Sequence, residues 1–282
     1  MLRLAPIYTV KSIDSILEMC FDFHLTKYKN KKVNMKRLFL YVLIGLMLLS
    51  LVISGCGQKT AKVRIATDAT WPPFESVNEQ TKEIEGFDID LMTAIAEKAG
   101  LEIEFVNMAW DPLLAGIAQC QYDAAISAMT ITEERKKEFL FSDPYFEAGQ
   151  IVTVRIDNTE VTSKDALSGK VAGAQIGTTG SFEIEKVAGA TLKTYDDIGL
   201  AFQDLMNGQI DAVVADNPLA LGYVGEYSDK LKTVGEVFTD ENYGIAVCKN
   251  KPDLVEKINE GLQAVKKEGL IETLVEKWLS SQ

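Results

Sequence analysis

Residues 170–187 read KVAGAQIGTTGSFEIEKV and contain a strand, a turn and a helix in immediate succession. The segment 170–176 predicts a strand, the glycine-flanked segment 177–180 a turn, and the segment 181–187 a helix. Strands that alternate with helices of this length are typical of α/β sheets whose two faces are both covered by helices. The stretch therefore predicts an α/β fold.

The same alternation occurs in two blocks of the chain. Two such blocks predict two lobes, each built on a mostly parallel sheet flanked by helices. No sequence repeat relates one block to the other. The predicted elements of the first block are 63–66, 88–99, 101–106, 112–119 and 124–127, and those of the second are 170–176, 181–187, 200–207, 211–215 and 218–223.

Charge is distributed unevenly along the 282 residues. Eight of the 29 basic residues precede Cys56, but only 3 of the 41 acidic residues do, so the part from Cys56 onward carries a net charge of −17. A body this acidic repels nucleic acid and anionic lipid headgroups. Composition is otherwise ordinary for a globular protein, at 47% hydrophobic and 25% charged residues, and we exclude a nucleic-acid partner.

The N-terminal part contains an export signal. Lys36 and Arg37 precede an apolar run over 38–53, and the small residues Ser54 and Gly55 then precede Cys56. A basic segment, an apolar segment and a small-residue cleavage site predict a signal peptide over 35–55. The ending VISGC resembles the bacterial lipoprotein box, which predicts lipidation of Cys56 and a short tether over 56–61. An uncleaved anchor helix is the alternative, and both place the body in the periplasm or on the outer face of the cytoplasmic membrane.

Residues 1–34 precede this signal and look like a doubtful leader. Met35 makes a natural start, so we expect 1–34 to reflect a misplaced gene start. They contain the single histidine, His24, which leaves the body without histidine for catalysis or for binding a metal.

Two cysteines remain in the body, Cys120 and Cys248. Two unpaired buried thiols and one disulfide between them are both compatible with an exported protein, and the sequence does not decide between the two.

Four short polar segments follow predicted strands, which is where open α/β sheets bind ligands. A Pro-stiffened aromatic loop provides a stacking face, and a glycine-flanked turn offers backbone N–H groups to an anion. The same loop could simply cover the core, and such turns are common. The segments are DATWPPFE at 68–75, AMTITEER at 128–135, IGTTG at 176–180 and DAVVADNP at 211–218.

Two positions offer the opposite charges that a zwitterion needs. Arg135 and Thr130 flank a predicted helix N-terminus, where N–H groups, a hydroxyl and a guanidinium can converge on a carboxylate. Asp216 ends an apolar strand and offers an acceptor to an ammonium group. The alternatives are ordinary helix caps, with Thr132 capping and Arg135 in solvent, and with Asp216 as the cap before Pro218.

Taken together, seven segments resemble the polar amino-acid-binding proteins of ABC importers, solute-binding protein family 3. They occur in the family's order and cover residues 62–279. The resemblance implies two α/β lobes, with lobe one over 62–147 and 245–282 and lobe two over 150–242, joined by two crossover strands near 146–149 and 240–244. The segments are 67–75, 86–91, 110–113, 127–135, 141–145, 177–180 and 211–216.

The resemblance also assigns residues to the ligand's α-carboxylate. Arg135, Thr130 and nearby N–H groups would hold it from one lobe, and Thr179, together with Thr178, would add donors from the other. Gly180 departs from the pattern, because many family members have a polar residue there, and contacts from that position are lost.

For the α-ammonium group, the resemblance implies Asp216 and a backbone carbonyl of Ser127 or Ala128. Trp71 and Trp110 would sandwich the ligand side chain, with Asp68 near its far end.

The groups expected around the ligand side chain are acidic and aromatic, and they suit a cationic or planar group. The sequence therefore favours arginine, lysine or another basic amino acid, with glutamine as the alternative. We expect a monomeric binding subunit that delivers free amino acid to the membrane permease of an importer, with no cofactor, no metal and no catalysis. Two rivals are a secreted dehydratase on the same fold and a ligand-sensing module that continues beyond Trp278 into spanning or signalling segments.

Overall fold

The computed structural model describes residues 39–40 and 62–280. The leader over 1–34, the lipidation site Cys56 and the tether over 56–61 lie outside the described residues, and so does the signal peptide over 35–55 apart from residues 39–40. No helix in the described part of the chain is both long enough and apolar enough to cross a membrane.

Lobe one is built on a five-stranded sheet with the order β5-β1-β6-β15-β7. Strand β1 pairs in parallel with β5 and β6, whereas β15 runs antiparallel to both of its neighbours. Four strands of the sheet therefore point in one direction. The strands are β1 (Val63–Thr67), β5 (Ile103–Asn107), β6 (Ala124–Ala125), β7 (Leu140–Phe141) and β15 (Ala246–Val247).

Helices cover both faces of this sheet. Successive side chains of β1 point to opposite faces, so each face contributes to a separate apolar core. Ile65 belongs to the same apolar core as Leu91 and Ile258, whereas Ala66 packs with Leu113 and Ile117. The helices of lobe one are α3 (Phe87–Ala99), α4 (Trp110–Ala118), α5 (Arg135–Glu138), α9 (Pro252–Lys267) and α10 (Leu270–Trp278).

Lobe two repeats the plan with the strand order β11-β10-β12-β9-β13. Here β9 is the strand that runs against its neighbours. Val214 packs with Ile184 on one face, and Val213 shares a core with Phe202 on the other. The elements are β9 (Gln150–Arg155), η1 (Lys164–Leu167), β10 (Val171–Gln175), α6 (Thr179–Glu185), β11 (Thr191–Tyr195), α7 (Ile198–Met206), β12 (Ala212–Asp216), α8 (Asn217–Glu226) and β13 (Leu231–Val234). The predicted two-lobed, mostly parallel α/β fold is confirmed.

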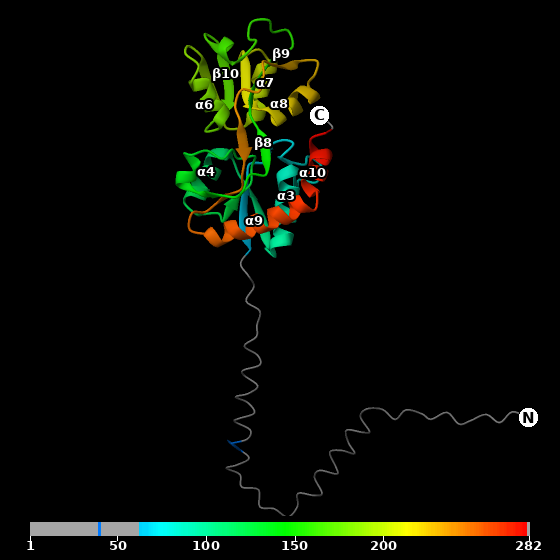
Figure 1. The fold of residues 1–282 in the computed structure, drawn as a ribbon. Coiled ribbons are helices and arrows are strands. Elements are labelled where there is room, and N and C mark those ends of the chain that lie inside the picture. Colours follow the sequence, from blue (N-terminus) through cyan, green and yellow to red (C-terminus); the bar gives the residue numbers. More distant parts are fainter. Residues whose placement is uncertain (1–38, 41–61, 281–282) are drawn as a thin grey trace, which may run out of the picture. The chain divides into compact units, whose positions relative to one another are not determined.

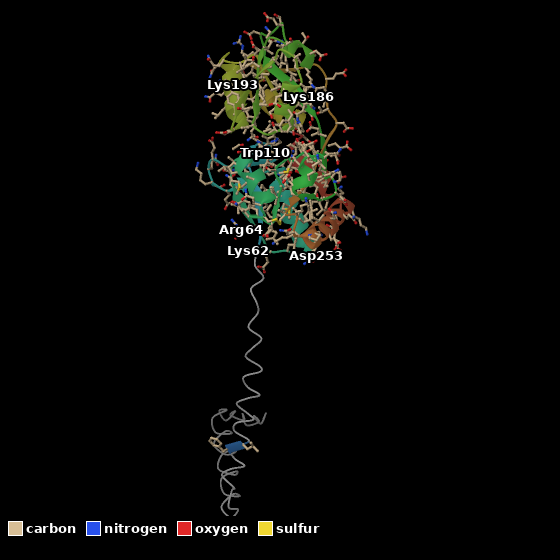
Figure 2. All side chains as sticks on the ribbon, turned by 90° about the vertical axis from the view of Figure 1, so that its left-hand side faces the viewer. Lys62, Arg64, Trp110, Lys186, Lys193 and Asp253 are labelled. Atoms are coloured by element: carbon tan, nitrogen blue, oxygen red, sulfur yellow. A yellow bond between two sulfur atoms is a disulfide. The ribbon has the colours of Figure 1, made fainter. Side chains whose placement is uncertain are left out.

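Two crossover strands connect the lobes, β8 (Phe146–Ala148) and β14 (Glu241–Tyr243), and they pair antiparallel with each other (Figure 1). Each crossover leads into the antiparallel strand of a sheet, β8 into β9 and β14 into β15. Trp110, at the start of α4, lies where the two lobes meet (Figure 2). The crossovers therefore run beside the region in which both lobes contribute side chains.

The aromatic loop over 68–75 differs from expectation, because it contains paired backbone. Strands β2 (Thr70–Trp71), β3 (Glu75–Val77) and β4 (Ile84–Glu85) form a small antiparallel sheet. A two-residue strand directly before two prolines leaves no periodic signal in the sequence, so β2 was not predicted.

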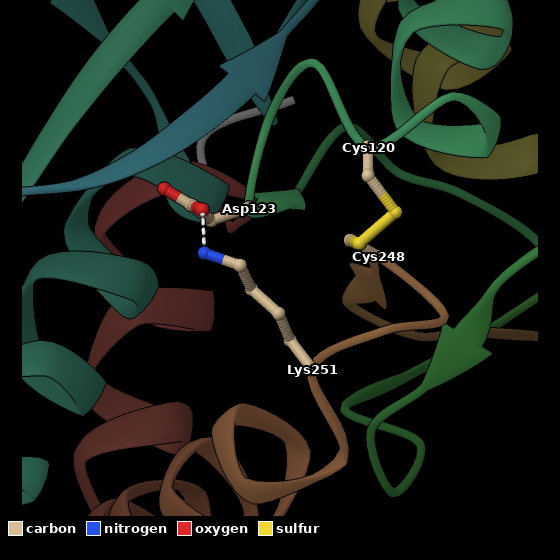
Figure 3. The surroundings of a disulfide bond; sticks show 4 residues. All are labelled: Cys120, Asp123, Cys248 and Lys251. Carbon is tan, nitrogen blue, oxygen red and sulfur yellow. Dashed lines mark hydrogen bonds and ion pairs between the residues drawn. A yellow bond between two sulfur atoms is a disulfide. The ribbon is translucent and has the colours of Figure 1, made fainter.

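The cysteine question has a definite answer in the structure, which joins Cys120 to Cys248 in a disulfide with a Cα–Cα distance of 5.0 Å (Figure 3). The bond links the segment after α4 to the end of β15 across 128 residues. An ion pair between Lys251 and Asp123 lies beside it. The disulfide therefore joins the two separate segments of lobe one, and the loop that it closes includes all of lobe two.

Candidate functional site

A cavity with about 300 Å³ of empty space lies between the lobes. All ten residues that the sequence predicted for ligand binding line it, and Gln175 is the one lining residue that was not predicted. The set comes from segments far apart in the chain because each segment ends a strand or begins a helix at the same edge of its sheet. The lining residues are Asp68, Trp71, Trp110, Ser127, Ala128, Thr130, Arg135, Gln175, Thr178, Thr179 and Asp216.

Arg135 is the cation of the cavity. It is the first residue of α5, its side chain is buried, and its Nη1 donates to the Thr130 carbonyl at 2.8 Å. Its Nη2 donates to the Gly177 carbonyl of the opposite lobe at 3.2 Å. Burial lowers the pKa of Arg135 to about 10, against the opposing effect of Asp216 and Glu241, so the guanidinium stays charged at neutral pH. The alternative of a solvated Arg135 is therefore wrong.

Trp110 supports this guanidinium. The Arg135 Cζ atom lies 5.2 Å from the centre of the Trp110 ring, a cation–π arrangement. Trp110 and Trp71 are 5% and 7% exposed, and no described residue accepts a hydrogen bond from either indole N–H. One face of Trp110 therefore contacts Arg135, and both indole N–H groups are buried without a described acceptor.

Asp216 is the buried carboxylate at the C-terminal end of β12. Its oxygens accept hydrogen bonds from Gln150 Nε2 and from the Tyr243 hydroxyl. Burial, together with the nearby negative charge of Glu241, raises the pKa of Asp216 to about 7. Although Asp216 precedes α8, its side chain makes no capping hydrogen bond, so the capping alternative does not explain it.

Asp68 is held between the lobes. Its Oδ1 accepts from the Thr70 hydroxyl at 2.9 Å, and its Oδ2 accepts from Gln175 Nε2 of lobe two at 2.8 Å. Burial raises the pKa of Asp68, and the hydrogen bond from Gln175 opposes that rise. Gln175 also donates to the Asp196 carbonyl at 2.9 Å, so both of its amide hydrogens are used. Its place at the end of the strand that precedes the glycine turn was the signal that could have found it.

The four hydroxyl groups of the cavity share one property, which is that each donates its single proton to another protein atom. Ser127 donates to Glu75 Oε1 at 2.8 Å, and Thr178 donates to the Gln175 carbonyl at 2.7 Å. Thr130 and Thr179 both donate to Glu241 Oε2, at 2.7 and 2.9 Å. A ligand in this geometry therefore meets hydroxyl oxygens that accept.

Comparison with known proteins agrees with this architecture. The family model for bacterial extracellular solute-binding proteins, family 3, matches residues 63–281. The chain belongs to this family.

Relatives within family 3 are amino-acid-binding proteins. The ABC transporter arginine-binding protein 1 of Escherichia coli strain K12 is 37% identical over 224 residues, which covers 77% of this chain and 90% of the relative. The ABC transporter glutamine-binding protein of Bacillus subtilis strain 168 is 32% identical, with 87% and 98% covered. The solved structure of an ancestral arginine-binding protein bound to arginine is 44% identical, with a TM-score of 0.75 and 78% and 99% covered.

One family position has a local explanation in this family 3 protein, the glycine that follows Thr179. A Cβ atom on Gly180 would lie 2.7 Å from the Val214 carbonyl oxygen and 2.8 Å from Gln150 Oε1. Both distances are shorter than real Cβ contacts. Gln150 therefore occupies the space into which a side chain at 180 would project.

Thr178 also differs from its predicted contribution. It is the N-cap of α6, and its Oγ1 accepts from the Ser181 N–H while its hydroxyl donates to Gln175. The helix therefore begins at Thr179, two residues before the predicted start. Capping is sufficient to explain the Thr178 hydroxyl.

Two completely buried carboxylates, Glu75 and Asp88, accept hydrogen bonds from Ser127 and Ala128. Ser127 donates to Glu75, and the Ala128 N–H donates to Asp88 Oδ2 at 2.7 Å. Ala128 has a φ of 43°, which is uncommon for a residue with a side chain. These contacts fix the backbone whose carbonyls are predicted to face the α-ammonium group.

Proposed function

We propose that this protein binds a basic amino acid, arginine or lysine, in the cavity outside the cell and delivers it to the membrane permease of an ABC importer. The observation that carries the proposal is the sorting of charge and hydrogen-bonding capacity in the cavity. One buried guanidinium and two buried carboxylates, Asp68 and Asp216, line the cavity, and its hydroxyl groups offer acceptors. This arrangement suits a ligand with one carboxylate and two cationic ends.

The α-carboxylate end belongs at Arg135. A guanidinium has five N–H groups, and two of those on Arg135 donate to protein carbonyls, which leaves three for a ligand. Trp71 and Trp110 also line the cavity, and the indole N–H group of each has no described acceptor. Backbone contacts and the Trp110 ring hold the guanidinium in place, so the carboxylate meets a preorganised partner.

The α-ammonium end belongs at Asp216. An ammonium group has three donors and no acceptor, and the cavity offers it a carboxylate and the oxygens of Thr130 and Thr179. A carbonyl of Ser127 or Ala128 completes the set in this proposal.

The far end of the ligand belongs at Asp68, beside Trp71. Gln175 orients the Asp68 carboxylate from the opposite lobe, so a cationic side chain would meet a fixed acceptor. A guanidinium or ammonium satisfies both that charge and the aromatic face.

Glutamine is a second candidate because its amide N–H₂ can also donate to Asp68. The glutamine-binding relative supports this candidate. Asp68→Asn separates the two, since it removes charge and keeps a hydrogen-bonding group. We expect the affinity for arginine and lysine to fall by about tenfold or more, and that for glutamine by much less.

The remaining parts of the proposal concern location and chemistry. We propose that a lipid on Cys56 holds a monomeric body at the outer face of the cytoplasmic membrane, and that the protein catalyses nothing. The disulfide supports an oxidising compartment. Cys56→Ser should release the protein from the membrane fraction or leave an unprocessed precursor there.

Calorimetric titration of the purified protein against each of the twenty amino acids tests the proposal. We expect one site per chain with the highest affinity for arginine or lysine, and recovery of the ligand unchanged after binding. A protein that binds none of the twenty contradicts the proposal. Conversion of the ligand would favour an enzyme on the same fold.

A further inference from the structure

Glu241 lies in the crossover strand β14 and is not among the residues that line the cavity. It is 6% exposed, and four hydrogen-bond donors converge on its two oxygens. Oε2 accepts from Thr130 at 2.7 Å, Thr179 at 2.9 Å and Gln150 at 3.4 Å, and Oε1 accepts from Thr239 at 2.9 Å.

These donors come from both lobes. Thr130 precedes α5 in lobe one, Thr179 begins α6 in lobe two, and Gln150 begins β9. One carboxylate therefore contacts the two cavity threonines that face each other across the lobes. It also contacts the glutamine that binds Asp216.

The consequence follows from the hydroxyl group itself, which has one proton and two lone pairs. Because Thr130 and Thr179 both give that proton to Glu241, neither can donate to a ligand. Thr130 can accept from a ligand, and Thr179, whose oxygen already accepts from Gln150 Nε2 at 3.1 Å, has one lone pair left for the same purpose. The threonines were expected from sequence to help bind the α-carboxylate. This geometry instead suits the α-ammonium group beside Asp216.

We infer that Glu241 is a positioning residue that fixes Thr130 and Thr179 as acceptors for the α-ammonium group of the ligand. The inference rests on the proposed function. By accepting the protons of Thr130 and Thr179, Glu241 makes their side of the cavity an acceptor side, whereas Arg135 provides the donors on the other side.

The charges around Asp216 favour the same position for the α-ammonium group as the hydrogen bonds do. Asp216 faces three titratable or charged groups, Arg135 from α5 and both Glu241 and Tyr243 from β14. After burial, Glu241 is the main cause that raises the pKa of Asp216, and Arg135 opposes it. An ammonium between Asp216 and Glu241 would relieve their mutual repulsion.

A purely structural role is the competing explanation, since the same hydrogen bonds tie the lobes to the crossover. The two explanations differ in what they predict for ligands that lack one end. A structural role changes the affinity for every ligand alike. A positioning role changes the affinity only for ligands that carry the α-ammonium group.

The experiment measures affinity by calorimetry for arginine and for 5-guanidinopentanoate, which is arginine without the α-amino group. At pH 8, where Asp216 is ionised, Glu241→Gln should weaken arginine about tenfold or more and weaken 5-guanidinopentanoate less than about threefold. Glu147→Gln is the matched control, because Glu147 is an exposed glutamate on the partner crossover β8, opposite Asn242, and it should leave both affinities unchanged.

The pH profile is a second readout. Removing the negative charge of Glu241 lowers the pKa of Asp216, so the loss of arginine affinity on acidification should begin at a lower pH in Glu241→Gln than in wild type. An unchanged profile together with equal losses for both ligands would overturn the inference and favour the structural role.

Thr179→Val and Thr179→Ser make the test independent of whether Glu241→Gln folds. Thr179→Val removes the hydroxyl and should weaken arginine about three- to tenfold and spare 5-guanidinopentanoate, whereas Thr179→Ser should bind both like wild type. Equal weakening of both ligands by Thr179→Val would show that the hydroxyl serves the carboxylate, which overturns the inference. Failure of the wild-type protein to bind any amino acid would instead overturn the proposed function.

Discussion

The molecule contains two pairs of buried carboxylates that resemble each other in burial and differ in what surrounds them. Asp216 and Glu241 lie at the cavity and the crossover, whereas Glu75 and Asp88 lie inside lobe one. Burial raises the pKa of Asp216 to about 7 and of Asp88 to about 6, and it raises that of Glu75 well above its ordinary value. A raised pKa alone therefore does not distinguish a binding site from a structural one.

Their neighbours do distinguish them. The first pair faces the guanidinium of Arg135, and Asp216 is in contact with the cavity. The second pair lies against Tyr145 and Ser127, and the negative charge of Asp88 adds to burial in raising the pKa of Glu75. Two neighbouring carboxylates that repel each other are relieved by a proton, so this pair needs no cation. In the proposed function, the ammonium group of the ligand completes the cavity pair.

The largest effect should come from removing the one cation of the cavity pair. Arg135→Ala should weaken arginine about 100- to 1000-fold, because a buried ligand carboxylate then lacks its strongest partner, at a cost of about 3–5 kcal/mol. Arg135→Lys should rescue little, since an ammonium does not present a planar fork. Arg155→Ala is the control, because Arg155 is a partly exposed arginine paired with exposed Asp157. A folded Arg135→Ala protein that binds arginine within threefold of the wild-type affinity would contradict the distinction between the two carboxylate pairs.

The next effect is the pH dependence of binding. Asp216 must be ionised to hold an ammonium group, and its raised pKa means that it takes up a proton as the pH falls through about 7. We expect the affinity for arginine to fall about tenfold between pH 7.5 and pH 5.5 in wild type, and to stay nearly flat in Asp216→Asn, which binds weakly throughout. Calorimetry at several pH values measures this. A flat wild-type profile would contradict the role of Asp216.

Stability without ligand should show the opposite trend. A carboxyl with a raised pKa in the folded state stabilises the protein below its unfolded pKa, and this contribution is lost as pH rises through the folded pKa. For Asp216 and Asp88 this window runs from about 4 to about 7 and 6. Asp216→Asn and Asp88→Asn should therefore both reduce the loss of melting temperature between pH 5 and pH 8, with Asp216→Asn alone also reducing affinity.

The smallest effect is expected inside lobe one. Glu75→Gln imitates the protonated carboxyl, so arginine affinity at pH 7 should stay within about threefold of wild type. The same charge removal at Asp216 should cost far more. If Glu75→Gln lowered the arginine affinity as much as Asp216→Asn does, both carboxylate pairs would contribute to ligand binding, and the distinction between them would be wrong.

Much of the cavity could be predicted because its residues lie at strand ends and helix starts, where short sequence motifs can be recognised. Asp68, Arg135 and Asp216 all lie in such segments and all line the cavity. Glu241 could not be found in this way, since it lies within a crossover strand and its hydrogen-bond partner Thr130 is 111 residues away. Long-range contacts of this kind leave no local pattern.

In the fold, too, the features with a local sequence pattern could be predicted, and those that depend on long-range contacts could not. The alternation of strands and helices predicted both sheets, whereas the antiparallel direction of β9 and β15 depends on where the crossovers enter the lobes. The Cys120–Cys248 pairing was likewise open until the fold placed the two residues together. The direction of the Thr130 and Thr179 hydrogen bonds could not be predicted, because Glu241, which accepts both protons, lies far from them in the sequence.

Proton release on binding tests the central claim most directly, namely that a zwitterion binds between Arg135 and Asp216. The measurement is a calorimetric titration with arginine at pH 6.5 in buffers of different ionisation enthalpy. Because Asp216, with a pKa of about 7, is mostly protonated at this pH and must ionise to hold the ammonium, we predict release of about half to one proton per arginine bound in wild type. Asp216→Asn should release none. Tight binding of arginine by wild type with no proton released, or no binding at all, would contradict the account.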